Sequence, residues 1–190
     1  MVRSRTVWAA AALLAATLGV AAVPAGAASA APARAVAACP TGWGSLAKTY
    51  DAGTATPLTD VRTGRHDCYD RFVVDVPGAS ASTLGFSVAY VDRLYQDASG
   101  RLIPVGGGAI LEVRVNAPAY DPRTGAATYP GRVAQPLPGV NLAGYSTFRD
   151  TRYAGSFEGV TQFGLGVRAR LPFRVQRLAD HLVVDVAHTW

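Results

Sequence analysis

Short segments in which apolar and polar residues alternate constrain the fold of this chain more than any other feature of its sequence. In residues 110–115, Leu111, Val113 and Val115 occupy every second position, which places them on one face of a strand. Similar segments recur at residues 71–76, 86–90, 161–165, 173–175 and 182–186. Glycine and proline punctuate them, as at Pro77-Gly78. This pattern is typical of an all-β, antiparallel sandwich or barrel.

The remaining stretches offer little regular structure. Residues 39–67 are rich in Gly, Thr, Pro and Asp, so we expect a loop there with one short strand near residues 58–61 and regular structure from Arg71 onward. No long pattern with a 3.6-residue period is present. The fold therefore contains at most one short helix, for which residues 145–153 are the best position.

Two of the predicted strands share a sequence. Residues 70–76 read Asp-Arg-Phe-Val-Val-Asp-Val, and residues 180–186 read Asp-His-Leu-Val-Val-Asp-Val, with five of seven positions identical. Convergence of two core strands explains the valines, but it accounts less well for the aspartate at the same alternate position, Asp75 and Asp185. Because the motif occurs only twice, we interpret it as two related strands of one sandwich rather than as a solenoid repeat.

Residues 1–30 have the organisation of a helical secretory signal peptide. Arg3 and Arg5 precede an uncharged apolar run at residues 7–23, and small residues follow at 28–30. We expect cleavage after Ala30, although a run of this length can also serve as a membrane anchor. The sequence then divides into a signal peptide (1–30), a flexible lead (31–42) and one domain (43–190), with no membrane span after signal removal.

The two cysteines, Cys39 and Cys68, both follow the signal peptide. An even number of cysteines in an exported protein favours a disulfide over a metal site or a nucleophile. Residues 36–39 also resemble a bacterial lipobox, in which Cys39 would be lipidated. A lipobox normally adjoins the apolar run, whereas this run ends near Val23, so the spacing favours secretion over lipidation.

The charge of the chain argues against a nucleic-acid partner. Removal of residues 1–30 takes away two arginines and no acidic residue, which lowers the net charge from +5 to +3. Nucleic-acid binding requires basic residues clustered in a stripe, and the sequence contains no such cluster.

The sequence also lacks the motifs of common enzymes and cofactor sites. It contains neither His-Glu-x-x-His nor Gly-x-Ser-x-Gly, and its three histidines are not at metal-ligand spacing. The run at residues 106–108 leads into a strand rather than a helix, so a turn or bulge explains it better than a phosphate cradle. We therefore expect no catalytic residue, no metal and no cofactor.

Several stretches carry a family resemblance. Residues 71–78 (Arg-Phe-Val-Val-Asp-Val-Pro-Gly) resemble the opening strand of the AMIN domain, a bacterial envelope module, and residues 172–186 resemble its ending. Further matching stretches are residues 43–46, 63–66, 106–108 and 157–161. Residues 43–188 are similar to the AMIN-like domain of exported actinobacterial proteins. The resemblance implies a β-sandwich and, for AMIN domains proper, attachment to peptidoglycan.

One group of residues has the chemistry of a wall-glycan site. It comprises aromatic rings that stack on sugars, arginines that pair with carboxylates, and a glutamate that accepts hydroxyl hydrogen bonds: Tyr145, Arg149, Arg152, Tyr153, Glu158 and Phe163. The alternative is that the tyrosines and Phe163 belong to the core and the arginines extend over them.

These observations favour a secreted, non-enzymatic cell-envelope protein that binds peptidoglycan or another wall glycan. A second hypothesis is a wall-glycan hydrolase that uses Glu158 and an aspartate, because a glycosidase needs two carboxylates. A third is an interaction module for an exported protein partner.

Overall fold

The computed structural model describes Cys39 and residues 42–190, and this part of the chain contains eleven strands and no helix. The predicted signal peptide, its cleavage site at Ala30 and nearly all of the lead lie outside the described residues. The strands are β1 (Lys48–Tyr50), β2 (Asp60–Arg65), β3 (Tyr69–Asp75), β4 (Phe86–Val91), β5 (Leu94–Tyr95), β6 (Leu102–Ile103), β7 (Ala109–Val115), β8 (Phe148–Phe157), β9 (Val160–Val167), β10 (Phe173–Leu178) and β11 (His181–Ala187).

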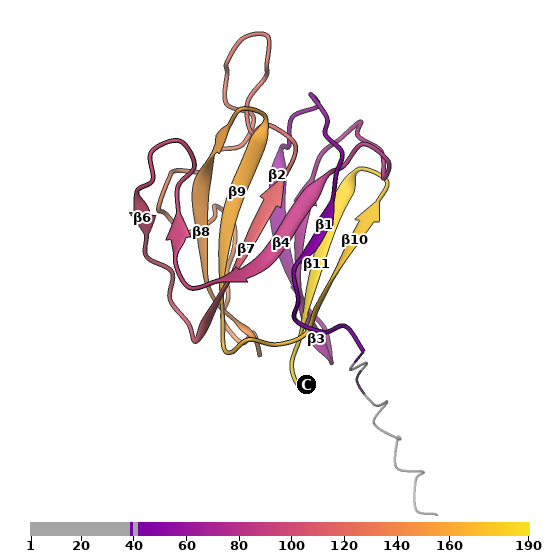
Figure 1. Cartoon of the computed structure of the whole chain (residues 1–190), viewed down its shortest axis with the longest axis vertical. Coiled ribbons are helices and arrows are strands. Elements are labelled where there is room, and N and C mark those ends of the chain that lie inside the picture. The colour runs from indigo at the N-terminus through magenta and orange to yellow at the C-terminus, as the bar shows by residue number, and fades with distance from the viewer. Residues whose placement is uncertain (1–38, 40–41) are drawn as a thin grey trace, which may run out of the picture. The chain divides into compact units, whose positions relative to one another are not determined.

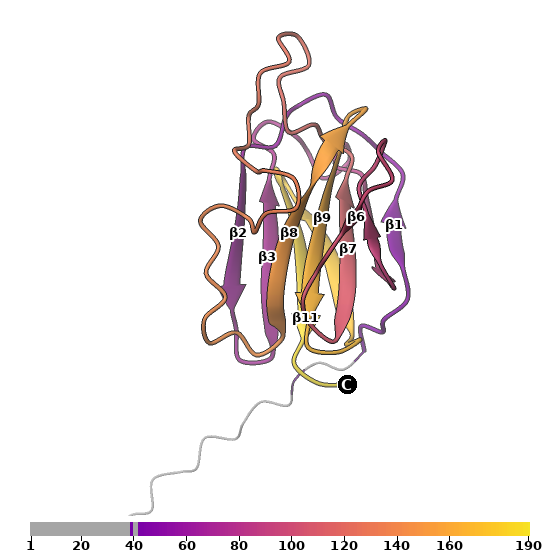
Figure 2. The same cartoon turned by 90° about the vertical axis from the view of Figure 1, so that its left-hand side faces the viewer.

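The strands form an antiparallel β-sandwich, as the alternation predicts. One sheet has five strands in the order β1-β4-β7-β9-β8, and the other has four in the order β10-β11-β3-β2 (Figures 1 and 2). Alternate residues of each sheet meet in a single core, where Phe72 of β3 lies edge-on to Phe163 of β9 with ring centroids 5.6 Å apart. Burial of these apolar faces supplies the main driving force for folding.

The two strands with the shared sequence are neighbours. β3 and β11 pair antiparallel, with Val73 opposite Val183, Arg71 opposite Asp185 and His181 opposite Asp75. Their two segments are thus related by an approximate twofold axis through the middle of the four-stranded sheet. The shared sequence therefore places an aspartate at each end of the outer face of this sheet.

The predicted helix at residues 145–153 is wrong, because β8 begins at Phe148 and pairs with β9 along its length. β8 contains irregularities between Phe148 and Asp150 and between Tyr153 and Gly155. Each extra residue shifts the alternation by one position and hides the period of two in the sequence.

The segment before Arg71 is also more regular than its composition indicates. It contains β1 and β2 instead of one short strand, and β3 already begins at Tyr69. β1 and β2 are edge strands of their sheets. Edge strands carry polar residues on their exposed sides, which weakens the apolar alternation that identifies a strand in sequence.

A small hairpin covers part of the outer face of the five-stranded sheet. β5 and β6 place Leu94 and Ile103 against Ala154, forming a second apolar cluster. Both terminal nitrogens of Arg114 bind Asp97 in the turn of this hairpin, at 2.8 and 2.6 Å. The hairpin is therefore fixed to the sheet by both packing and charge.

The connection between β7 and β8 includes a projecting hairpin, residues 120–127, which the Tyr120–Ala127 bridge closes. Figures 1 and 2 show it extending beyond the ends of both sheets. Arg123 stands near its tip, with 88% of its side chain exposed.

The Cys39–Cys68 disulfide predicted from cysteine parity is present, with the Cα atoms 5.2 Å apart. It ties the start of the domain to the turn before β3 and contributes about 3–4 kcal/mol to stability in the chain-entropy description. Among the described residues, no helix has the length and apolarity needed to cross a membrane.

Candidate functional site

The candidate site lies on the outer face of the four-stranded sheet. Because side chains alternate along a strand, the residues of β3, β10 and β11 that point away from the core gather on this face. They include Tyr69, Arg71, Arg174 and Asp185. Trp43, from the segment before β1, packs beside them.

Asp185 is the centre of the site. Its side chain is fully buried, yet it accepts hydrogen bonds from Arg71 Nε at 2.7 Å, Arg71 Nη2 at 2.9 Å and Arg174 Nε at 2.8 Å. The two arginine side chains remain 25% and 34% exposed. One buried carboxylate thus holds two guanidinium groups at the surface in fixed positions.

Aromatic rings surround the two guanidinium groups. The ring of Trp43 lies edge-on to that of Tyr69 with the centroids 5.6 Å apart. The ring of His66 stacks on Tyr69 with the centroids 4.5 Å apart. The guanidinium of Arg174 lies 4.4 Å from the centre of the Trp43 ring and 5.4 Å from that of Tyr69, while Arg71 lies 5.3 Å from Tyr69. These cation–π contacts further restrict the arginines. We call Trp43, His66, Tyr69, Arg71, Arg174 and Asp185 the arginine–aromatic cluster.

The electrostatics of the cluster suit an anion. Two guanidinium groups and one carboxylate give it a local charge of +1. Hydrogen bonding to Asp185 raises the pKa of Arg71 above its ordinary value. Arg174 uses only Nε toward Asp185, and neither of its terminal nitrogens donates to another residue in the part of the chain that the structure describes. Arg174 therefore keeps donors for a ligand carboxylate or phosphate.

A second ionic group lies at the other end of the same face. Asp75 accepts hydrogen bonds from Arg62 Nε at 2.8 Å and Arg62 Nη2 at 3.0 Å. His181 Nδ1 lies 2.7 Å from the same carboxylate, an ion-pair distance without hydrogen-bond alignment. Asp75 and Asp185 thus have the same role, which is to hold basic side chains on the outer face.

The cluster predicted from sequence does not form one surface. Tyr145 is half-buried, stacks on Phe148 and hydrogen bonds through its hydroxyl to Thr63 at 2.8 Å. Arg149 donates to the carbonyl groups of residues 145, 146 and 148 and so fixes the turn before β8. Arg152 binds Asp150 at 3.0 Å and the carbonyl of Pro104 at 3.1 Å.

The two rings expected to stack on sugars belong to the core. Phe163 is fully buried and Tyr153 is 7% exposed, and both pack against Tyr129. Desolvation raises the pKa of Tyr153 to about 12, as expected for a phenol in apolar surroundings. Neither ring has a free face for a sugar, which corrects the expectation for these two residues.

Glu158 lies apart from the other five residues. It is exposed in the turn between β8 and β9, with a φ of +47°. Asp97 lines the same shallow pocket, but Arg114 binds both of its carboxylate oxygens. The pocket thus brings two carboxyl groups near each other while committing one of them to an ion pair.

The sequence contained one signal for the arginine–aromatic cluster, the aspartate repeated at Asp75 and Asp185. The partners of these aspartates were not predictable, because Arg71, Arg174 and Trp43 come together only through strand order. Gly107 and Gly108 are explained structurally, since a Cβ at Gly107 would lie 2.8 Å from the carbonyl oxygen of Val167 and one at Gly108 would clash with the carbonyl oxygen of Arg168. In the described residues, no group of three or more His, Cys, Asp or Glu side chains is placed to hold a metal.

Comparison with known proteins identifies a family for this sandwich. Curated proteins and solved structures give no match to the chain. The family model of the AMIN-like domain matches residues 56–188, which include β2 to β11 and every residue of the arginine–aromatic cluster except Trp43. With its fold and most of its sequence in agreement, the chain belongs to the AMIN-like domain family.

Proposed function

We propose that this domain is a non-enzymatic, exported cell-envelope module that binds peptidoglycan through the arginine–aromatic cluster. Membership of the AMIN-like family is consistent with a cell-envelope module. The observation that supports peptidoglycan binding is the guanidinium of Arg174, which Asp185 holds over the Trp43 ring while its terminal nitrogens donate to none of the described residues.

The chemistry of peptidoglycan fits this cluster. Its glycan presents sugar faces that pack on aromatic rings, and its peptide stems end in carboxylates. Trp43, which is partly exposed, supplies a ring, whereas His66 and the two arginines cover Tyr69. Arg174 and Arg71 supply donors for a carboxylate. Rings and arginines are two of the three kinds of group that the sequence predicted for a glycan site; in this cluster different residues supply them, without the glutamate.

Two observations support export without lipidation. The basic, apolar and small-residue order of residues 1–30 is that of a cleaved signal peptide. The thiol of Cys39 is used in the disulfide and is not free to receive a lipid. We expect the mature protein in culture medium to begin at Ala31 with both cysteines oxidised, which its intact mass reports. A species starting at a lipidated Cys39 would contradict this.

The hydrolase hypothesis rests on Glu158 and has less support. Glycoside hydrolysis needs one carboxyl group as a proton donor and a second as a base or nucleophile. Asp97 lines the same pocket, but both of its carboxylate oxygens accept hydrogen bonds from Arg114. We expect the purified domain to release no reducing ends from wall fragments. Release that Glu158→Gln abolished would overturn the non-enzymatic proposal.

Sedimentation with isolated peptidoglycan sacculi tests the binding proposal. We expect the wild-type domain to sediment with the sacculi and Arg174→Gln to bind at least about tenfold more weakly, because a charge-assisted hydrogen bond is lost. Asp185 keeps Arg71 as its partner in this variant, so the sheet should remain folded.

Arg123→Gln is the matched control, because it removes the same charge from the projecting hairpin. It should bind sacculi like the wild type. Equal losses of sacculus binding in both variants would show that nonspecific charge attraction accounts for the interaction. Absence of sedimentation by the wild type would reject peptidoglycan binding and favour an exported protein partner.

A further inference from the structure

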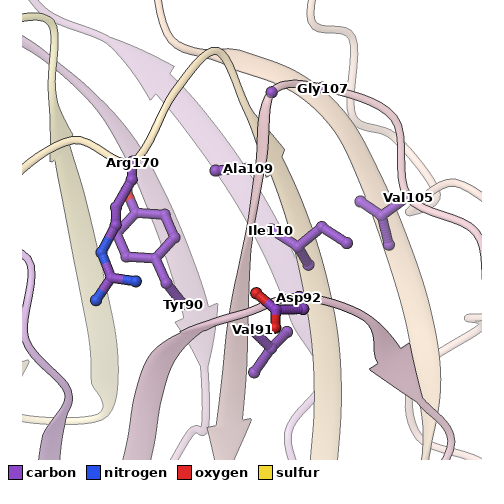
Figure 3. Close-up of a pocket in the computed structure, with 9 residues that line it drawn as sticks. Tyr90, Val91, Asp92, Val105, Gly107, Ala109, Ile110 and Arg170 are labelled. Atoms are coloured by element: carbon purple, nitrogen blue, oxygen red, sulfur yellow. The ribbon is translucent and has the colours of Figure 1, made fainter.

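A separate groove lies at the end of the five-stranded sheet, about 350 Å³ in volume. It is formed by the end of β4, the loop before β7, the start of β7 and the connection between β9 and β10. Figure 3 shows Arg170 and Tyr90 on one side of the groove and Val105 on the other, with Asp92 and Ile110 between them. This volume accommodates a small ligand.

The cationic side of the groove is preorganised. The hydroxyl of Tyr90 donates to the carbonyl of Leu171 at 2.8 Å and accepts from its N–H at 3.0 Å, which fixes the ring. The guanidinium of Arg170 lies over this ring, 5.2 Å from its centre, and Nη2 reaches the carbonyl of Ser45 at 3.4 Å. Arg170 is therefore held in place without a carboxylate partner in the described part of the chain.

The anionic group of the groove is Asp92, an exposed residue directly after β4. Its carboxylate forms no hydrogen bond or ion pair with any described residue, whereas Asp75, Asp150 and Asp185 each bind an arginine. Asp92 and Arg170 line one groove without bridging to each other. Both charges are thus available to a ligand that lies between them.

The rest of the lining is aliphatic. Val91 and Ile110 are opposite each other in the pairing of β4 with β7, and Val105 faces them from the loop. All three are partly exposed. A ligand in the groove would therefore meet an apolar surface next to the two charges.

We propose that this groove binds a zwitterionic amino-acid group carried on an aliphatic chain. The ammonium of the ligand pairs with Asp92, its carboxylate pairs with Arg170, and its aliphatic part packs on Val91, Val105 and Ile110. The site is distinct from the arginine–aromatic cluster, and the inference does not depend on peptidoglycan binding.

The arrangement discriminates against other ligand classes. A simple anion would pair with Arg170 but be repelled by Asp92. A simple cation would pair with Asp92 but be repelled by Arg170. A neutral sugar would pair with neither Asp92 nor Arg170 and would leave both charges of the groove unpaired. Only a ligand with both charges satisfies both groups.

Three matched probes test the proposal on the mature protein: leucine, isoamylamine and 4-methylpentanoate. The second is leucine without its carboxylate, and the third is leucine without its ammonium. We expect leucine to cause saturable shifts in the amide NMR signals of Gly107, Gly108 and Ala109. Each truncated probe should bind at least about tenfold more weakly, because it leaves one charge of the groove unpaired.

Two variants complete the test. Asp92→Asn and Arg170→Gln should each weaken leucine binding about tenfold, whereas Arg174→Gln, in the other site, should leave it unchanged. Loss of leucine binding in Arg174→Gln would contradict the separation of the two sites. Equal binding of leucine and 4-methylpentanoate would show a simple anion site and overturn the proposal. Absence of saturable shifts with leucine up to its solubility limit would also overturn it.

Discussion

Asp185 and Asp75 have equivalent positions in two related strands but different surroundings. Asp185 is fully buried beneath two arginines, whereas the Asp75 side chain is 14% exposed and lies within ion-pair distance of Arg62 and His181. Burial strengthens an ion pair and raises the cost of breaking it, because the remaining charges cannot be hydrated freely.

We therefore expect Asp185→Asn to lower the free energy of unfolding by about 3 kcal/mol, near the lower end of the range for broken buried pairs because Arg71 and Arg174 retain some water contact. Asp75→Asn should cost about 1 kcal/mol, as expected for a more exposed pair. Urea unfolding of both variants measures the difference. Equal losses would show that burial of Asp185 does not set its contribution.

The buried side chains of Tyr129 and Tyr153 make the stability of the domain depend on pH in the alkaline range. Burial raises the pKa of Tyr153 to about 12 and raises that of Tyr129 as well, while an unfolded tyrosine ionises near its ordinary value of 10. Between these values the unfolded state loses protons that the folded state retains, so stability must fall as the pH rises.

We expect the urea midpoint to be constant from neutral pH to about pH 9 and to decrease between pH 10 and 12. Tyr129→Phe should weaken this decrease. It should leave stability at pH 7 unchanged or slightly higher, since the buried Tyr129 hydroxyl has no hydrogen-bond partner among the described residues. A large loss of stability at pH 7 would imply a partner for this hydroxyl.

The sequence identified the strands in which an apolar residue faces the core at every second position. β3, β4, β7, β9, β10 and β11 were all predicted, because Phe72, Val88, Leu111 and their neighbours keep a strict period of two. β8 was missed because two irregularities break its period. Of the edge strands β1 and β2, which tolerate polar residues, β1 was missed and only the start of β2 was predicted, as the short strand near residues 58–61.

The candidate site was harder to predict than the fold. Local sequence grouped Tyr145 with Tyr153 and Arg149 because they are close in the chain. The arginine–aromatic cluster instead combines Trp43, Tyr69 and Arg174, which lie far apart in sequence and meet through the pairing of β10, β11 and β3. Strand order is a tertiary property that periodicity does not encode.

Gly166 in β9 shows how closely one strand approaches the loop before β7. A Cβ at this position would lie 1.8 Å from the carbonyl oxygen of Gly106 and 2.9 Å from Cβ of Asp150. We expect Gly166→Ala to destabilise the domain by about 3 kcal/mol, because the obstructing atom is backbone and cannot rotate away.

Gly53→Ala is the matched control for this variant. Its Cβ would approach no heavy atom closer than 3.9 Å, and its φ lies outside the left-handed region. Its midpoint in thermal unfolding should stay close to that of the wild type. A similar loss in both variants would point to a general intolerance of alanine rather than to the contact with Gly106.

At the scale of the whole molecule, the two faces of the sandwich have different surroundings. The β5–β6 hairpin covers part of the outer face of the five-stranded sheet, whereas the outer face of the four-stranded sheet carries arginines held by Asp75 and Asp185. A sheet face that retains positioned arginines and rings is suited to an extended ligand, as the proposed binding of peptidoglycan requires.

The response of sacculus binding to salt separates the two kinds of contact in the proposed interface. At about 1 M salt the screening length falls to roughly 3 Å, which weakens attraction between the positively charged protein and anionic wall polymers but leaves packing of sugars on rings largely intact. We expect partial retention of the wild-type domain on sacculi under these conditions. Arg174→Gln should lose mainly the salt-sensitive part of binding, and Trp43→Leu mainly the salt-resistant part, while Arg123→Gln behaves like the wild type at both ionic strengths. Complete elution of the wild type at high salt, with Trp43→Leu unchanged at low salt, would remove the aromatic rings from the interface and leave a purely ionic contact.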